Sequence, residues 1–124
     1  MTLPLTMRAA VYDQYGPPRV LRIEQVPLPE PAAGHVLVQV VASSINDWDY
    51  HLLTGRPLVN RAAGLRRPQY RTLGADVAGR VVATGSGVSA FAVGDEVMGD
   101  LSGAGFGAFA SFASAPQEAL VHKP

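Results

Sequence analysis

Glycine and proline interrupt this chain so often that long regular elements are ruled out. The 124 residues include 13 glycines and 10 prolines, which separate short segments rich in valine. Proline cannot donate a ladder hydrogen bond, and glycine weakens a strand interior, so both mark the ends of elements. About seven short strands with one short helix predict a mainly β domain, either a barrel or a sandwich.

The predicted strands are runs of apolar and β-branched residues between these turn residues. They cover residues 7–12, 20–26, 35–43, 77–84, 95–98, 108–113 and 120–121. In the clearest of them, 35–43, the even-numbered side chains from 36 to 42 face one side, and Leu37 and Val41 face the other. A strand that is apolar on both faces lies between two layers or in a barrel wall.

One segment breaks this two-residue period and predicts a short helix over residues 46–53. Asn46 or Asp47 can cap it, and Gly55 can end it. The following stretch, 56–72, is expected to be a loop punctuated by proline and arginine. Residues 1–6 are expected to form an N-terminal extension, ahead of one domain that spans 7–124.

Composition excludes several classes of protein. Ten basic and ten acidic residues cancel, which argues against a nucleic-acid-binding face. There are no cysteines, so disulfides and thiolate zinc sites are excluded, and a reducing cytoplasmic location is expected. The apolar stretches are too short to cross a bilayer, so no membrane partner is expected.

Two sequence features could be mistaken for a cofactor site and a metal site. The run Gly103–Ala108 matches the dinucleotide pattern G-x-G-x-x-G/A, but that pattern needs a strand before it and a helix after it. Because residues 109–113 read as a strand, we expect the glycines to form a loop and hairpin that binds no cofactor. His35, His51 and His122 lie in separate elements without ligand spacing, so no metal site is expected.

Six short motifs resemble, in order, the GroES-like N-terminal domain of the medium-chain dehydrogenase/reductase family. They are Ala42–Gly55, Leu73–Val82, Gly85–Phe91, Val93–Val97, Gly107–Phe112 and Leu120–Pro124. The resemblance runs over residues 7–124 and implies a partly open β-barrel with one or two short helices. It also implies a nucleotide-binding domain, absent from this chain, that follows Lys123 and Pro124 and holds most of the cofactor.

Within that family, the sequence resembles the zinc-free quinone oxidoreductase branch. Zinc alcohol dehydrogenases have a cysteine at the position of Asn46 and a Gly-His-Glu tripeptide where residues 74–76 are Gly-Ala-Asp. The quinone oxidoreductases have an Asn-x-x-Asp corner, here Asn46 and Asp49. The resemblance implies metal-free hydride transfer from NADPH or NADH to a quinone or an α,β-unsaturated carbonyl, and a chain that is inactive without the other domain.

The residue chemistry fits this interpretation. Without a Lewis acid a simple ketone accepts hydride poorly, whereas a quinone or enone delocalises the added charge. The Asn46 amide can then donate to the developing oxyanion, and Tyr50 or His51 can deliver the proton. The position of His51 resembles that of a relay histidine in alcohol dehydrogenases, where quinone reductases tend to have tyrosine, so the proton donor stays open.

Each of these residues also has a purely structural interpretation. Asn46 can act only as a helix cap, and Asp49 only as an acceptor that holds the corner. His51 can be merely packed or solvated. Asp49 and Trp48 are expected at the corner that faces substrate and cofactor, and Trp48 is also expected to pack in the core.

Two other functions compete with this one: a co-chaperonin-like interaction barrel, with 56–72 as its partner-binding loop, and the enoyl reductase portion of a larger synthase. The expected partners are a small carbonyl or quinone substrate and the nucleotide-binding domain. A second copy of the chain is also expected, because the surface that the missing domain would cover is apolar.

Overall fold

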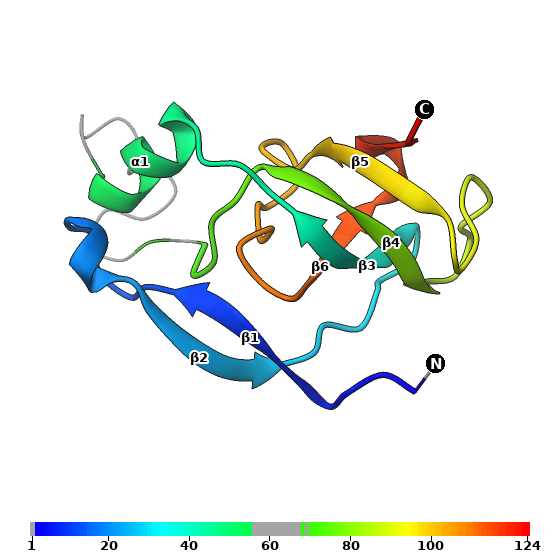
Figure 1. The fold of residues 1–124 in the computed structure, drawn as a ribbon, viewed down its shortest axis with the longest axis horizontal. Helices are drawn as coiled ribbons and strands as arrows, with labels where there is room; N and C mark the ends of the chain where they lie inside the picture. Colours follow the sequence, from blue (N-terminus) through cyan, green and yellow to red (C-terminus); the bar gives the residue numbers. More distant parts are fainter. Residues whose placement is uncertain (1, 56–67, 69) are drawn as a thin grey trace.

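The computed structural model describes residues 2–55, 68 and 70–124, without the side chain of Trp48. The loop expected at 56–72 therefore lies largely outside the described residues. Within them, seven strands form two antiparallel sheets that do not close into one barrel (Figure 1). The prediction of a mainly β, partly open fold with little helix is confirmed.

The smaller sheet pairs β1 (Thr6–Val11) with β2 (Arg22–Pro27). The 3-10 helix η1 (Pro18–Val20) occupies the start of the predicted second strand, because Pro18 favours a helical first turn. The Leu5 carbonyl accepts a hydrogen bond from the Leu28 N–H at 3.0 Å. The sheet therefore includes Thr6 and extends to Leu5, both within the expected extension.

The larger sheet has five strands in the order β6-β3-β4-β5-β7. In chain order they are β3 (His35–Ala42), β4 (Asp76–Thr84), β5 (Glu96–Asp100), β6 (Phe112–Pro116) and β7 (Leu120–His122). The short 3-10 helix η3 (Gln117–Ala119) precedes β7, and α1 (Asp47–Thr54) lies between β3 and β4 in sequence. Figure 1 shows α1 at the end of the molecule opposite to the C-terminus.

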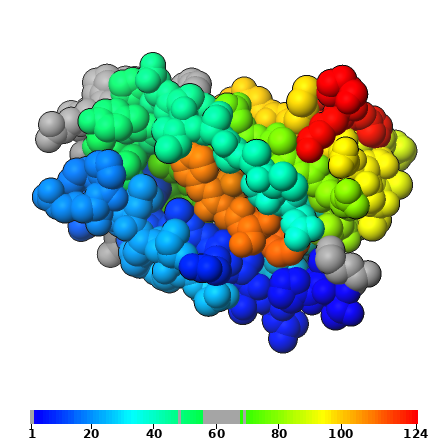
Figure 2. Space-filling model, viewed as in Figure 1, coloured from blue at the N-terminus to red at the C-terminus, as the bar shows by residue number. Residues whose placement is uncertain are grey.

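Strand β6 begins four residues later than the strand predicted at 108–113. Residues 109–111 instead bridge to β1, where Ala10 N donates to Phe109 O and Ser111 N donates to Arg8 O, both at 2.9 Å. In Figure 2, the blue surface of β1 and β2 lies against the orange surface of this segment. The prediction that the glycine run forms a hairpin is wrong, because β3 and β4 separate β5 from β6 in the sheet.

Strand β3 is buried on both faces over its first half, as expected, and departs from simple alternation only near its end. Val36, Leu37 and Val38 are all buried, whereas Val41 is 74% exposed. Its pairing with β4 shifts register between Leu37 and Val38, and again between Val40 and Ala42. The first shift leaves Val82 of β4 as the extra residue, and the second leaves Val41 of β3. The two-residue period of β3 therefore fails only at Val41.

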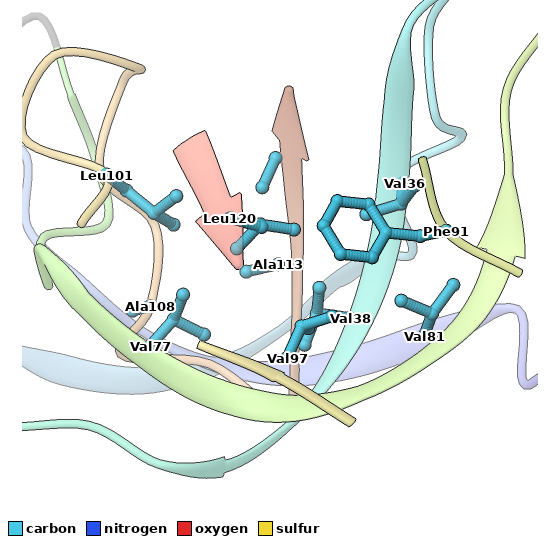
Figure 3. Close-up of a cluster of buried hydrophobic side chains, with 11 residues drawn as sticks. Val36, Val38, Val77, Val81, Phe91, Val97, Leu101, Ala108, Ala113 and Leu120 are labelled. Atoms are coloured by element: carbon cyan, nitrogen blue, oxygen red, sulfur yellow. The ribbon is translucent and has the colours of Figure 1, made fainter. Parts of the chain in front are cut away.

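The main core lies on one face of the large sheet. Figure 3 shows its side chains pointing into a common space among the strands. Its buried members are Val36, Val38, Val77, Val81, Phe91, Val97, Leu101, Ala108, Ala113, Ala115 and Leu120. The β-branched valines among them are restricted at χ1 and pack well on the pleated surface of a sheet.

A second, smaller core holds α1 on the rest of the fold. Tyr12, Leu53 and Leu73 are buried together, and the Tyr12 hydroxyl donates to the Leu52 carbonyl at 3.3 Å. Burial, with a smaller contribution from Tyr15, raises the pKa of Tyr12 above its usual range, so the group stays a neutral donor. This cluster fixes the helix relative to β1.

Candidate functional site

The candidate site is a corner where the chain leaves β3 and enters α1. The Asn46 carbonyl accepts from Asp49 N at 3.1 Å and from Tyr50 N at 3.4 Å. Asn46, rather than Asp47, is therefore the N-cap residue. At the other end, Gly55 adopts a left-handed conformation with φ of 66° and closes the helix as predicted.

Asp49 is the only charged residue buried among those the structure describes, with 3% of its surface exposed. One carboxylate oxygen accepts from Asn46 N at 3.1 Å, and the other accepts from Gly74 N, also at 3.1 Å. The first contact completes a capping interaction. The second ties the helix start to the segment that leads into β4.

Gly74 allows this close approach of two backbone segments. Its φ is 107°, and a Cβ there would lie 2.6 Å from the Phe109 backbone nitrogen. The Gly74 carbonyl accepts from Ala108 N at 3.1 Å. Asp49, Gly74 and the chain near residue 108 therefore meet at one point.

Two serines attach the corner to the start of β4, and the sequence analysis did not identify them. The Ser43 hydroxyl donates to the Asp76 carbonyl, and the Ser44 hydroxyl donates to an Asp76 carboxylate oxygen, each at 2.5 Å. The available signal was a pair of small hydroxyl residues separated from the helix cap Asn46 only by Ile45.

The predicted site residues share one end of one helix, but their exposure differs. Asn46 is half-buried, whereas Tyr50 is 57% exposed and His51 is exposed. The rings of Tyr50 and His51 meet edge to face, with centroids 6.3 Å apart. Trp48 belongs to α1, and its expected core position lies outside what the structure describes.

A shallow hollow of about 480 Å³ lies beside this corner. Four residues from adjacent strands form a row across it: Ala42 opposite Ala78, Ala78 opposite Met98, and Met98 opposite Val121. Asp76 and Asp100 stand at one end, and the Ser102 backbone N–H holds the pKa of Asp100 below its usual value. The hollow therefore has an apolar floor and an acidic end.

The glycine run Gly103–Ala108 does not have the local structure of the dinucleotide fingerprint. Residues 102–105 form turns, and Gly105, Phe106 and Gly107 have positive φ. In the described part of the chain, β6 follows this run, and no α-helix does. The strand–turn–helix unit that holds a pyrophosphate is therefore not formed at this run.

The structure does not bring the three histidines together. His35 contacts the Ala33 carbonyl through Nδ1 at 3.1 Å, and His51 lies on α1. His122 Nε2 lies 3.1 Å from an Asp95 oxygen. Across residues 2–55, 68 and 70–124, no group of three potential metal-binding side chains occurs, and no helix there is long and apolar enough to cross a membrane.

Comparison with known proteins identifies the class of this fold and corner. The family model of the alcohol dehydrogenase GroES-like domain matches residues 32–124. The chain therefore belongs to the alcohol dehydrogenase GroES-like domain family, within the medium-chain dehydrogenases/reductases.

Individual relatives are quinone and alkenal oxidoreductases. The chain is 37% identical to the chloroplastic quinone-oxidoreductase QR1 of Triphysaria versicolor over 95% of its own length and 35% of that protein. It is 32% identical to the chloroplastic NADPH-dependent alkenal/one oxidoreductase of Arabidopsis thaliana, over 99% of the chain and 32% of that protein. The quinone oxidoreductase structure from Coxiella burnetii superposes with a TM-score of 0.83 at 31% identity, over 96% of this chain and 37% of that one. The chain thus spans about a third of the length of these relatives.

Proposed function

We propose that this chain is the substrate-side domain of an oxidoreductase that reduces a quinone or an α,β-unsaturated carbonyl without zinc. The cofactor, NADPH or NADH, would bind mainly to a nucleotide-binding domain outside this chain and supply the hydride. The proposal rests on the family, on the relatives named above and on the corner at Asn46.

The observation that carries the proposal is the contact through Asp49. This carboxylate joins Asn46 N to Gly74 N, so the corner and the 74–76 tripeptide meet in space. In zinc alcohol dehydrogenases, to which these segments are similar, both positions hold zinc ligands. Here they present an amide, at Asn46, and the buried methyl group of Ala75. An amide can donate a hydrogen bond to an oxyanion, and a methyl group cannot bind a metal.

Without a metal, hydrogen-bond donors can stabilise the charge that hydride transfer adds only when the substrate itself delocalises that charge. The Asn46 amide would donate to the substrate oxygen as negative charge develops there. Tyr50 and His51, adjacent and exposed on α1, are the proposed proton sources. An enoyl reductase within a larger synthase reduces the same kind of conjugated bond, so the substrate test below covers this alternative as well.

The remaining expectations are proposals of the same kind. Metal independence is inferred from Asn46 and Ala75 at the two positions where zinc alcohol dehydrogenases have ligands. A small-molecule substrate and self-association through an apolar surface are inferred from the family resemblance. A cytoplasmic location stays a prediction, since two of the relatives named above are chloroplastic proteins.

A substrate panel tests the proposal in the protein that joins this chain to its nucleotide-binding domain. With NADPH and then NADH, we expect turnover of 1,4-benzoquinone and 2-cyclohexenone, negligible turnover of cyclohexanone, and no effect of EDTA. Reduction of cyclohexanone that EDTA abolishes would show a zinc-dependent alcohol dehydrogenase instead.

A further inference from the structure

We propose that Ser44 and Asp76 form a positioning pair that sets where Asn46 presents its amide. The Ser44 hydroxyl donates to the Asp76 carboxylate at 2.5 Å, across 32 positions in the sequence. This inference rests on the proposed function, because it assigns the pair a role only through Asn46.

The corner is attached to the β4 side at both of its ends. On the helix side, the Asp49 carboxylate holds Asn46 N and Gly74 N. On the strand side, Ser43 and Ser44 both donate to Asp76, one to its backbone and one to its side chain. Asn46 lies between these two attachments, so its position depends on both.

The strand-side attachment is the weaker one. Ser43 and Ser44 are exposed, and the next residue, Ile45, is 82% exposed, so little packing holds this segment. The bulge at the end of β3 also removes regular pairing just before it. A side-chain hydrogen bond therefore has more influence on the geometry here than it would in a packed strand.

The two serine contacts can be separated by substitution. Asp76→Ala removes the acceptor of Ser44 but keeps the backbone carbonyl that Ser43 uses. Asp76→Asn keeps an amide oxygen that can accept from Ser44, and Ser44→Thr keeps the hydroxyl. If Ser44 and Asp76 act as a unit, these two conservative substitutions should have only a small effect on the rate of hydride transfer.

The test is a double-mutant cycle on the complete enzyme, with single-turnover hydride transfer, KM for the cofactor and melting temperature as readouts. Ser44→Ala and Asp76→Ala should each slow hydride transfer about fivefold, roughly the value of one net hydrogen bond, with KM for the cofactor unchanged. The double variant should be no slower than either single one, since both remove the same contact. Ser44→Thr and Asp76→Asn should restore most of the rate. Ser86→Ala, an exposed serine just beyond the far end of β4, is the matched control.

Asn46→Ala measured in parallel separates the two claims. If Asn46→Ala is slow but both alanine variants match the control, or if their effects simply add, the positioning role is wrong and the proposed function stands. If Asn46→Ala itself is as fast as the parent, the proposed function of the corner fails first. A purely structural role for the pair would lower the melting temperature of Ser44→Ala and leave the rate per folded enzyme unchanged.

Discussion

At the scale of single residues, Asp49 shows how one carboxylate organises the corner. It accepts the backbone N–H groups of Asn46, three positions before it, and of Gly74, 25 positions after it, and both contacts are 3.1 Å long. Hydrogen bonds to a charged group contribute more than neutral ones, and a buried N–H left without a partner is costly.

Asp49→Ala should therefore lower the free energy of unfolding by about 3 kcal/mol, because it leaves two backbone N–H groups without their hydrogen-bond acceptor. Asp47→Ala, at an exposed acidic residue in the same first turn, should cost under about 1 kcal/mol. Urea denaturation of both variants checks this difference. Equal losses would mean that the Gly74 contact contributes nothing.

Residue roles were only partly predictable from the sequence. The pattern indicated Asp49 as a possible acceptor, but its partner Gly74 is distant in sequence and became apparent only from the fold. Ser43 and Ser44 form a visible hydroxyl pair, but such a pair is typical of an ordinary turn until its acceptor at Asp76 is known. Long-range contacts of this kind depend on register, which local sequence does not specify.

At the scale of elements, Gly79 controls how closely β3 and β4 approach. A Cβ at this position would lie 2.0 Å from the Gln39 carbonyl oxygen, which is a backbone atom that cannot rotate away. Only glycine fits at this point of the pairing between β3 and β4.

Gly79→Ala should destabilise the domain by about 2–3 kcal/mol, as overpacking does in a fixed backbone. Gly103→Ala, where a Cβ would meet nothing within 4 Å, is the control and should change stability by less than about 0.5 kcal/mol. The measurement is the urea midpoint at constant m-value. A Gly79→Ala protein as stable as the control would show that the strands separate without cost.

The turn after β1 is joined to β2 by an ion-pair cluster that should respond to acid. Hydrogen bonds from Arg71 and then from Arg22 lower the pKa of Asp13 from 3.8 to about 2. Because the folded value lies below the unfolded one, this stabilisation is complete above about pH 4 and is lost as the pH falls towards 2.

A carboxyl NMR titration should place the midpoint of Asp13 near 2. Arg71→Ala should move that midpoint up towards 3.8, since it removes the largest cause of the shift. Arg80→Ala, in the separate exposed pair with Glu96, should leave it in place. A midpoint near 3.8 in the parent would mean that the cluster does not form in solution.

At the scale of the whole molecule, the sequence predicted the architecture better than its details. Turn residues and short apolar runs gave a mainly β fold with one short helix, because these signals are local. The start of β6 was missed, since residues 109–111 pair with β1 from the other end of the chain. The two register shifts between β3 and β4 were also missed, because register depends on how two distant segments pair.

The described fold has no strand–turn–helix unit at its glycine run, so this chain alone should bind NADPH only weakly. Calorimetry on the 124-residue chain should show no binding at micromolar affinity or tighter. The complete protein is the positive control. Tight binding by the short chain would mean that residues 103–108 hold the cofactor after all.

The most direct test of the proposed role of Asn46 compares rate with stability in Asn46→Ala, within the complete enzyme. Losing an oxyanion donor should slow single-turnover hydride transfer roughly a hundredfold or more, while the affinity for the cofactor stays unchanged. Loss of a helix cap alone would cost about 1 kcal/mol of stability and leave the rate per folded enzyme unaltered. We expect the slow enzyme; a variant that is less stable but equally fast would contradict the assignment of Asn46 to the chemistry.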